Sequence, residues 1–225
     1  MIDKSPQKIK EMFNRISSKY DLMNNFISLG LHKIIKKCAV NDLLKDRNVN
    51  NILDCCTGTG DIALILKTKF PDSKITGIDV SPKMLELAKQ KVKNVKFIEG
   101  SCTDLPFEDN SFDLVTIFFG LRNIEDYEKA ISEIYRILKP EGKILYLDFG
   151  KSKYTVTIFN IIVNIVAKMF FQDIYPYRYL LKSKEEFMVE YDLVNEFKQK
   201  NIELIEQKKY VFNTILTLLL KKCKE

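Results

Sequence analysis

The chain of 225 residues is 46% hydrophobic and 29% charged, the profile of a soluble globular protein with enough residues for one domain and a sizeable core. No stretch of about 20 uncharged apolar residues predicts a transmembrane helix, and the first residues lack the apolar segment of a secretion signal. Five cysteines without a CxxC pair argue against a disulfide framework and a structural zinc site, so we expect a cytoplasmic protein that binds no metal.

The net charge of +6 comes mainly from lysine, because only five of the 36 basic residues are arginine. The lysines are scattered along the chain, whereas nucleic-acid recognition depends on arginine and on clustered positive charge. We therefore expect no nucleic-acid partner. A solvated lysine-rich surface and a weak peripheral attraction to the inner face of an anionic membrane both fit the charge.

Residues 1–46 are predicted to form helices around a polar turn at Asn24–Gly30. From residue 51, short β-branched runs alternate with helical patterns, which is typical of βαβ units and a mostly parallel sheet. The predicted strands are Asn51–Cys56, Lys74–Asp79, Val95–Glu99, Asp113–Phe118 and Lys143–Phe149. The first predicted helix follows the strand Asn51–Cys56 and a glycine turn, and it runs to about Lys69. The second starts at Ser81-Pro82, and the third spans Asp126–Leu138 and is ended by Pro140 and Gly142.

The C-terminal third starts with an apolar insert, Lys151–Leu181. Within it, 156–171 carries one narrow polar stripe and is too short to span a bilayer as a helix. One interpretation is a helix that packs on its own domain. The other is a helix that contacts a membrane or the prenyl tail of a lipid substrate. A helix near Glu185–Lys200 follows, and the runs Ile202–Glu206 and Tyr210–Leu220 suggest an antiparallel pair at the sheet edge. We predict a single domain, with N-terminal helices (1–46), a binding core (47–150) and a lid with a sheet edge (151–225).

The most informative segment is the turn between the first strand and the next helix, which contains Gly58 and Gly60. Glycines there let the backbone approach a ligand at the carboxyl end of a strand. Asp79 ends the second strand, where a carboxylate can bind the two hydroxyls of a ribose. Both NAD and S-adenosylmethionine carry such a ribose, so this spacing leaves both cofactors open.

Two further carboxylates favour S-adenosylmethionine over NAD. Asp54 precedes the glycines, where it can meet the amino-acid end of S-adenosylmethionine directly or through water, whereas its charge would repel a pyrophosphate. Asp104 follows the third strand, where an adenine could be held. The alternative is that Asp54 and Asp104 only cap helices or turns. The residues expected to hold the cofactor are Asp54, Gly58, Thr59, Gly60, Asp79, Ser101, Cys102 and Phe118.

The segments DCCTGTGD (54–61), GIDVSPKMLELAKQK (77–91), LPFEDNSFDLVTI (105–117) and EIYRILKPEG (133–142) resemble a class I S-adenosylmethionine-dependent methyltransferase. More narrowly, YDLMN (20–24) with Ser28 and His32, together with FGLRN (119–123), is similar to the C-methyltransferase family of ubiquinone and menaquinone biosynthesis. The resemblance implies a Rossmann-like α/β fold with a seven-stranded sheet, one late antiparallel strand and a helical lid over the acceptor.

The same resemblance implies methylation of a ring carbon of a prenylated quinol, with Tyr20, Asn24 and His32 on the acceptor side. Arg122 and Asn123 follow the fourth strand at its carboxyl end, so we expect them to carry the acceptor chemistry, with the guanidinium stabilising a phenolate. The competing interpretation is that Arg122 pairs with Glu125 or Asp126 and only holds the loop. The adjacent Cys55 and Cys56 are expected to act as small apolar side chains.

The loop CCTG (55–58) resembles the demethylmenaquinol branch of this family more than the ubiquinone branch, and the resemblance implies a naphthoquinol acceptor, with a benzoquinol as the alternative. A small-molecule O- or N-methyltransferase and a non-catalytic S-adenosylmethionine-binding protein stay open as alternatives. The prenyl tail length, the general base and the oligomeric state, a homo-oligomer included, are not indicated by the sequence.

Overall fold

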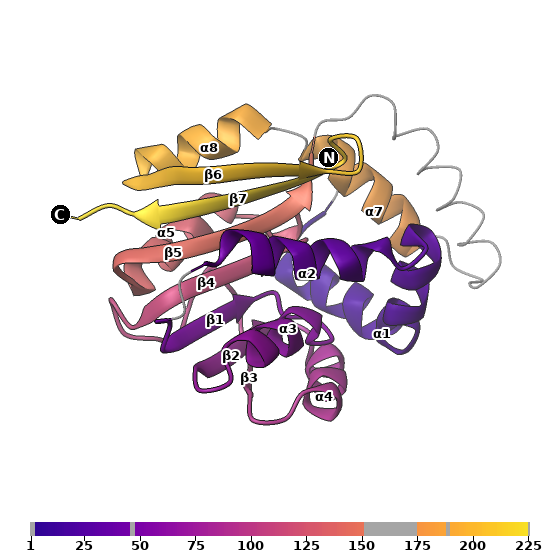
Figure 1. Ribbon diagram of the computed structural model, residues 1–225. Helices are drawn as coiled ribbons and strands as arrows, with labels where there is room; N and C mark the ends of the chain where they lie inside the picture. The colour runs from indigo at the N-terminus through magenta and orange to yellow at the C-terminus, as the bar shows by residue number, and fades with distance from the viewer. Residues whose placement is uncertain (1–2, 46–47, 151–174, 188–189, 225) are drawn as a thin grey trace.

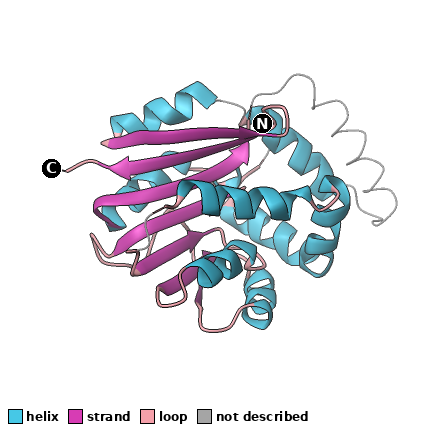
Figure 2. Ribbon diagram, in the orientation of Figure 1, coloured by secondary structure: helices cyan, strands magenta, loops and turns pink. Residues whose placement is uncertain are grey.

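The computed structural model describes residues 3–45, 48–150, 175–187 and 190–224, which form one seven-stranded sheet with helices on both faces (Figure 1, Figure 2). The strand order is β3-β2-β1-β4-β5-β7-β6. The strands are β1 (Asn51–Cys55), β2 (Lys74–Asp79), β3 (Lys96–Glu99), β4 (Phe112–Phe118), β5 (Leu138–Phe149), β6 (Ile202–Tyr210) and β7 (Ile215–Lys222). Strands β1 to β5 pair in parallel and β7 runs antiparallel to β5 and β6, which confirms the predicted Rossmann-like sheet.

The strand order reverses direction between β1 and β4, which are neighbours although two strands separate them in sequence. From β1 the chain proceeds outward to β2 and β3, and it then crosses back to β4 and β5. In open α/β sheets a crevice forms outside the carboxyl ends of the strands at such a reversal, and ligands bind there. The fold therefore places its binding site beyond Cys55 and Phe118, the last residues of β1 and β4.

Two apolar cores lie on the two faces of the sheet. One contains buried side chains of α2 (Leu31–Leu43) and α3 (Asp61–Lys69), and the other contains those of α5 (Tyr127–Ile137) and α8 (Glu190–Gln199). Neighbouring residues of one strand contribute to opposite cores, as Ile52 and Leu53 of β1 do. This alternation is the two-residue period of a strand, and it explains the near-continuous apolar runs of the parallel strands.

The predicted helix start at Ser81 is confirmed. Ser81 Oγ accepts a hydrogen bond from the backbone N–H of Met84, and Pro82 occupies the first position of α4 (Pro82–Lys91). Asp126 caps α5 in the same way, because its side chain accepts from the N–H of Lys129.

The N-terminal helix is longer than predicted. Helix α1 (Pro6–Ser28) includes most of the segment expected to be a turn, and only Leu29 and Gly30 separate it from α2. Met23 and Ile27 are buried, so the apolar face of α1 continues past Asn24 and Asn25, which the sequence suggested as part of a turn. Leu29 and Gly30 both adopt left-handed φ angles, of 50° and 77°, and their N–H groups bond back to Phe26 and Asn25. This geometry ends a helix within two residues.

The helix predicted for Asp126–Leu138 is confirmed to within one residue at each end, but the strand predicted for Lys143–Phe149 begins earlier. Helix α5 ends at Ile137, and β5 starts at once with Leu138, which pairs with Phe112. The next pair along the ladder joins Lys143 to Leu114, so residues 139–142 form an irregularity within the strand. Leu138 is buried in the same core as α5 and already pairs with β4, which explains why β5 starts before Lys143.

The C-terminal elements follow the predicted order with different bounds. Helix α8 corresponds to the helix predicted near 185–200, and α7 (Tyr175–Glu186) begins within the predicted insert. Strand β6 extends four residues beyond Glu206. The last strand begins at Ile215 instead of Tyr210, because residues 211–214 form the turn. The 156–171 segment lies outside the described residues. Within the described chain no helix has the length and apolarity needed to cross a membrane.

Candidate active site

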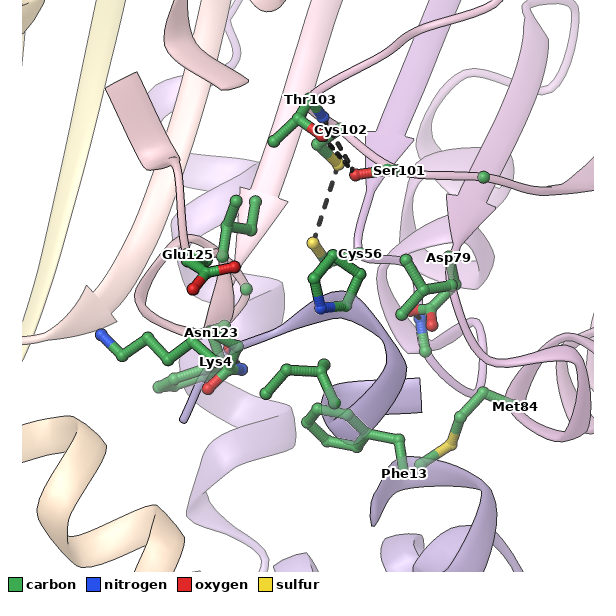
Figure 3. A pocket seen from close by; sticks show the side chains of 18 of the residues that line it. Lys4, Phe13, Cys56, Asp79, Met84, Ser101, Cys102, Thr103, Asn123 and Glu125 are labelled. Atoms are coloured by element: carbon green, nitrogen blue, oxygen red, sulfur yellow. Dashed lines mark hydrogen bonds between the residues drawn. The ribbon is translucent and has the colours of Figure 1, made fainter. Parts of the chain in front are cut away.

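A cavity of about 150 Å³ opens at the carboxyl ends of β1, β2 and β4, where the strand order reverses (Figure 3). Its wall contains side chains from the glycine turn, the ends of β2 and β4 and the loop after β3, and it is closed by α1. Seven of the residues singled out in the sequence line it: Tyr20, Gly58, Asp79, Ser101, Cys102, Phe118 and Asn123. The structure thus brings together residues from across the first 123 positions.

Asp79 is fixed at the floor of this first cavity by two backbone hydrogen bonds. Its Oδ2 accepts from the N–H of Gly58 and its Oδ1 from the N–H of Ser81, each at 2.9 Å. Burial raises the pKa of the carboxyl, and the backbone bonds oppose that shift. A carboxylate oxygen has lone pairs for more than one donor, so Asp79 can accept from both hydroxyls of a ribose. The Asp79 carboxylate beside the Gly58 backbone therefore fits the ribose of S-adenosylmethionine.

Gly60 does not line the cavity and has a packing role. Its φ of 82° is left-handed, and a Cβ there would come within 3.0 Å of the Ala88 Cβ on α4. The glycine therefore allows the start of α3 to lie against α4.

Asp54 also lies behind the cavity wall and not on it. Its two carboxylate oxygens accept from the hydroxyls of Thr57, at 2.5 Å, and Thr116, at 2.7 Å. Burial raises the pKa of Asp54 to about 6, although both hydroxyls lower it. In this structure Asp54 fixes the glycine turn to β4.

Thr59 belongs to a charged network that joins four helices. Its Oγ1 donates to Asp21 Oδ1 on α1 at 2.7 Å and accepts from Lys91 on α4 at 3.0 Å. Lys91 also pairs with Asp21 and Asp61, and Lys36 on α2 pairs with the second oxygen of Asp61. The side chain of Thr59 therefore holds α1 over the glycine turn and lies outside the cavity lining.

The loop after β3 contributes Ser101 and Cys102 to the cavity, while Asp104 is exposed and outside its lining. Ser101 Oγ lies 2.8 Å from Thr103 Oγ1 and accepts from the N–H of Thr103. The structure places these two polar side chains, and not Asp104, at the cavity edge (Figure 3).

The cysteines around the cavity are free thiols with raised pKa values. Cys56 and Cys102 lie 3.8 Å apart, sulfur to sulfur. Hydrogen bonding to Cys102, followed by burial, holds the pKa of Cys56 well above its usual value. Hydrogen bonding to Cys55, together with burial, does the same for Cys102 although its contact with Cys56 lowers the pKa, so thiolates are scarce at neutral pH. A Cβ at Gly120 would approach the Cys56 Cβ to 2.5 Å, so the pair fits against a residue without a side chain. This supports the apolar role expected for Cys56.

A second, larger cavity of about 420 Å³ adjoins the first between α1, α2, α7 and the turn after β6. It is mainly apolar, and the side chains of Met12, Ile16, Met23, Ile27, Ile35 and Phe149 contribute to its wall. Tyr20, Asn24, His32, Arg122 and Asn123 all line it. The five residues expected on the acceptor side therefore share one cavity.

Arg122 pairs with Asp148, so the proposed pairing with Glu125 or Asp126 is wrong. Its Nη1 donates to Asp148 Oδ1 at the end of β5 and to the carbonyl of Phe119. The guanidinium also lies over the rings of Phe119 and Phe149, at 5.7 and 5.1 Å from their centroids. Glu125 and Asp126 line the first cavity, while Arg122 faces the second.

Asn123 lies at the junction of the two cavities with both ends of its amide bonded. Its Nδ2 donates to the Phe119 carbonyl, and its Oδ1 accepts from the hydroxyl of Tyr179 on α7, each at 3.2 Å. Tyr179 was not predicted as a site residue. The tyrosines in YRYL (177–180) were a signal in the sequence. The contact itself joins positions 56 residues apart, so no local spacing reveals it.

His32 faces the acceptor cavity with one ring nitrogen already bonded. Ser28 Oγ donates to the carbonyl of Asn24 at 2.6 Å, so it accepts from His32 Nδ1 at 2.7 Å. The network assigns the proton to Nδ1 and leaves Nε2 as an acceptor. Burial, followed by the charge of Lys36, lowers the pKa of His32 to about 4. The ring is therefore neutral at physiological pH.

The sequence profile of the ubiE/COQ5 methyltransferase family matches residues 1–218. The demethylmenaquinone methyltransferase of Thermotoga maritima is 36% identical over 208 residues, which cover 89% of this chain and 90% of that protein. The enzyme of the same name from Staphylococcus aureus is 38% identical over 203 residues, or 86% of this chain and 84% of that protein.

Solved structures share the fold at low identity. A SAM-dependent methyltransferase of Thermotoga maritima, described as a possible histamine N-methyltransferase, has a TM-score of 0.70 at 20% identity and covers 95% of this chain and 99% of its own. One from Aquifex aeolicus has a TM-score of 0.63 at 18% identity, over 99% and 100% of the two chains. The fold, the paired cavities and the profile match agree, and the chain belongs to the ubiE/COQ5 methyltransferase family.

Proposed function

We propose that the protein transfers a methyl group from S-adenosylmethionine to a ring carbon of a prenylated quinol, converting demethylmenaquinol to menaquinol. The names of the two bacterial relatives support this acceptor, and the family supports methyl transfer. The proposal places the protein in the cytoplasm, where it meets a membrane only peripherally.

The shared wall of the two cavities carries this proposal. Phe13, Tyr20, Phe119 and Asn123 line both the first cavity and the second. A donor in one and an acceptor in the other would therefore meet beside these side chains. Direct transfer needs the reacting atoms about 3 Å apart and in line, and two cavities with a shared wall would bring donor and acceptor next to each other.

On the donor side, Asp79 would accept the ribose hydroxyls, and Gly58 would let the backbone approach the cofactor. Ser101, Cys102 and Phe118 would line the adenine side. Asp54 would act from behind the wall, through its charge on the amino-acid end or through water. When bound, S-adenosylmethionine supplies an electrophilic methyl group on a sulfonium.

On the acceptor side, the apolar wall would exclude water and hold the prenyl tail, and Arg122 would stabilise the negative charge of the quinol oxygen. Deprotonating a ring hydroxyl makes the neighbouring carbon a better nucleophile, and the proton on that carbon leaves after the new bond forms. His32 Nε2 and Tyr20 are polar groups of the same cavity that would orient the hydroxyl.

A labelled methyl-transfer assay tests the proposal. The protein is incubated with S-adenosylmethionine carrying a deuterated methyl group and with either a prenylated naphthoquinol or a prenylated benzoquinol, and the product is fragmented in a mass spectrometer. We expect the label on a ring carbon of the naphthoquinol. Label on oxygen or nitrogen, preference for the benzoquinol, or cofactor binding without transfer would each contradict the proposal.

A further inference from the structure

Large apolar side chains project into solvent around the mouth of the acceptor cavity. Leu29 is 82% exposed and Phe212 is 87% exposed, and both line this cavity. Leu31 and Val211, also exposed, line it as well. Single exposed apolar residues are ordinary on a protein surface, but several around one opening indicate an interaction site.

The two turns that carry these residues have unusual backbone conformations. Leu29 and the consecutive residues Val211, Phe212 and Asn213 all have φ angles between 48° and 66°. The left-handed region is unfavourable for side chains other than glycine and asparagine, above all for a β-branched one such as Val211. The β6–β7 turn therefore holds the Phe212 side chain in solvent, and no part of the described chain buries it.

Two neighbouring residues extend this apolar surface along the helices. Phe26 lies one turn before Leu29 on α1, and Ile34 lies one turn after Leu31 on α2, and both are exposed. We name this surface the mouth patch. It consists of Phe26, Leu29, Leu31, Ile34, Val211 and Phe212.

The charged side chains of the first turns of α2, beside the mouth patch, are positive. No Asp or Glu occurs between Leu22 and Asn41, while Lys33 and Lys37 are exposed on the same stretch of α2 as Ile34. On the other side of the opening Lys208 and Lys209 precede Val211, but Lys208 pairs with Asp42 and Glu206 at 3.6 Å, so the lipid contact is assigned to the lysines of α2. Apolar side chains flanked by lysine are the composition that binds the surface of an anionic bilayer.

We propose that the mouth patch docks on an anionic lipid bilayer, with its apolar side chains in the interface and Lys33 and Lys37 against the lipid phosphates. The acceptor cavity would then open directly onto the membrane. A water-insoluble tail could pass from the lipid into the apolar cavity without crossing bulk water. The mouth patch consists of other residues than the 156–171 segment that the sequence suggested for membrane contact, which lies outside the described residues.

A lipid surface fits the mouth patch better than a second copy of the chain does. In a two-fold dimer the same patch faces itself, which would bring Lys33 and Lys37 of both copies together. It would also close the entrance to the acceptor cavity. Neither objection applies to a bilayer that carries negative charge and contains the acceptor.

Vesicle binding tests this inference without donor or acceptor, so its failure is distinct from a failure of the methyl-transfer proposal. Vesicles of phosphatidylcholine with phosphatidylglycerol are compared with phosphatidylcholine alone by flotation. Leu29→Asn/Phe212→Asn removes apolar side chains while asparagine tolerates the left-handed φ, and Leu64→Gln/Ile205→Thr is the control at other exposed apolar sites. We expect the first pair, and not the control, to weaken binding about tenfold or more.

The charge variant Lys33→Gln/Lys37→Gln should weaken binding to the anionic vesicles about fivefold per lysine, and added salt should weaken binding of the unsubstituted protein. The control, Lys74→Gln/Lys96→Gln, removes two exposed lysines on β2 and β3. Binding that is equal for both lysine pairs would overturn the assignment of the lipid contact to α2.

A fluorescence measurement keeps the test decisive if a loss variant does not fold. The chain has no tryptophan, so Phe212→Trp and Leu64→Trp each introduce a single reporter. We expect anionic vesicles to shift the emission of the Phe212→Trp protein to shorter wavelength and to leave that of Leu64→Trp unchanged. No emission shift of the Phe212→Trp protein with vesicles would overturn the proposal. So would a dimer of the protein that the Leu29→Asn/Phe212→Asn variant dissociates, because the mouth patch would then bind a second copy of the chain.

Discussion

Arg122 and Asp148 form a nearly buried ion pair between the loop after β4 and the end of β5, with 2.7 Å between Nη1 and Oδ1. The same Asp148 oxygen accepts from the N–H of Phe149. Within the described chain, Arg122 Nε and Asp148 Oδ2 have no hydrogen-bond partner. The pair therefore fixes the guanidinium at the acceptor cavity while leaving part of its bonding capacity unused.

Arg122→Lys should lower turnover about a hundredfold or more. Lysine keeps the charge but lacks the planar set of donors, and removing one donor that stabilises an oxyanion costs about 2.7–4 kcal/mol. The affinity for S-adenosylmethionine should change little, because Arg122 faces the second cavity. Steady-state kinetics and calorimetry measure the two effects. Near-normal turnover, or joint loss of cofactor binding and fold, would show that Arg122 is only structural.

Asp148→Asn should lower the free energy of unfolding by about 3–5 kcal/mol, since it leaves the charge of Arg122 buried without its partner. Arg122→Met/Asp148→Leu removes both charges and should recover most of that stability while remaining inactive. Denaturant unfolding and the methyl-transfer assay separate the outcomes. A double variant that regains turnover with its stability would assign catalysis to other residues.

The donor side was largely predictable because its residues follow a local rule. Gly58 lies just past the end of β1 and Asp79 is the last residue of β2, and the ends of parallel strands meet at one edge of the sheet. What spacing could not show is which side chains turn inward. Thr59 lies in the same turn as Gly58, and Asp54 lies in the last part of β1. Their hydrogen bonds to Asp21 and Thr116 nevertheless direct these side chains into the surrounding structure.

The acceptor side depended on the resemblance and was less predictable. The contacts that define it join distant positions, such as Tyr179 with Asn123 and Arg122 with Asp148. The mouth patch was not predicted because Leu29 and Phe212 are ordinary apolar residues in sequence. Only the left-handed turns place their side chains in solvent.

Asp79→Asn should weaken S-adenosylmethionine binding by about 1.5–3 kcal/mol, roughly ten- to a hundredfold, because charge-assisted bonds to the ribose are lost. The asparagine keeps the size of the side chain beside Gly58. Calorimetric titration with S-adenosylmethionine and with NAD provides the check. Unchanged affinity in the variant, or tighter binding of NAD than of S-adenosylmethionine, would contradict the cofactor assignment.

Asp54→Asn should abolish one source of pH-dependent stability. The pKa of Asp54 is raised from 3.8 to about 6 in the folded protein, so its contribution is largest below pH 4 and is lost as the pH rises through 6. Urea unfolding across this range should show a smaller loss for the variant than for the unsubstituted protein. If the charge of Asp54 also attracts the cofactor, affinity for S-adenosylmethionine falls in the same variant.

His32 should remain neutral throughout the physiological range, and it is the sole histidine of the sequence, so one NMR signal reports on it in a protein without a histidine tag. Its pKa of about 4 lies below the ordinary value of 6.5 because the folded environment disfavours the charged ring. The contribution of His32 to stability is therefore complete above pH 6.5 and decreases as the pH falls toward 4. We expect the ring signal to be constant from pH 6 to 8, with nitrogen shifts that place the proton on Nδ1. Titration near 6.5, or a proton on Nε2, would mean that Ser28 does not hold the ring and that Nε2 is not available to orient an acceptor hydroxyl.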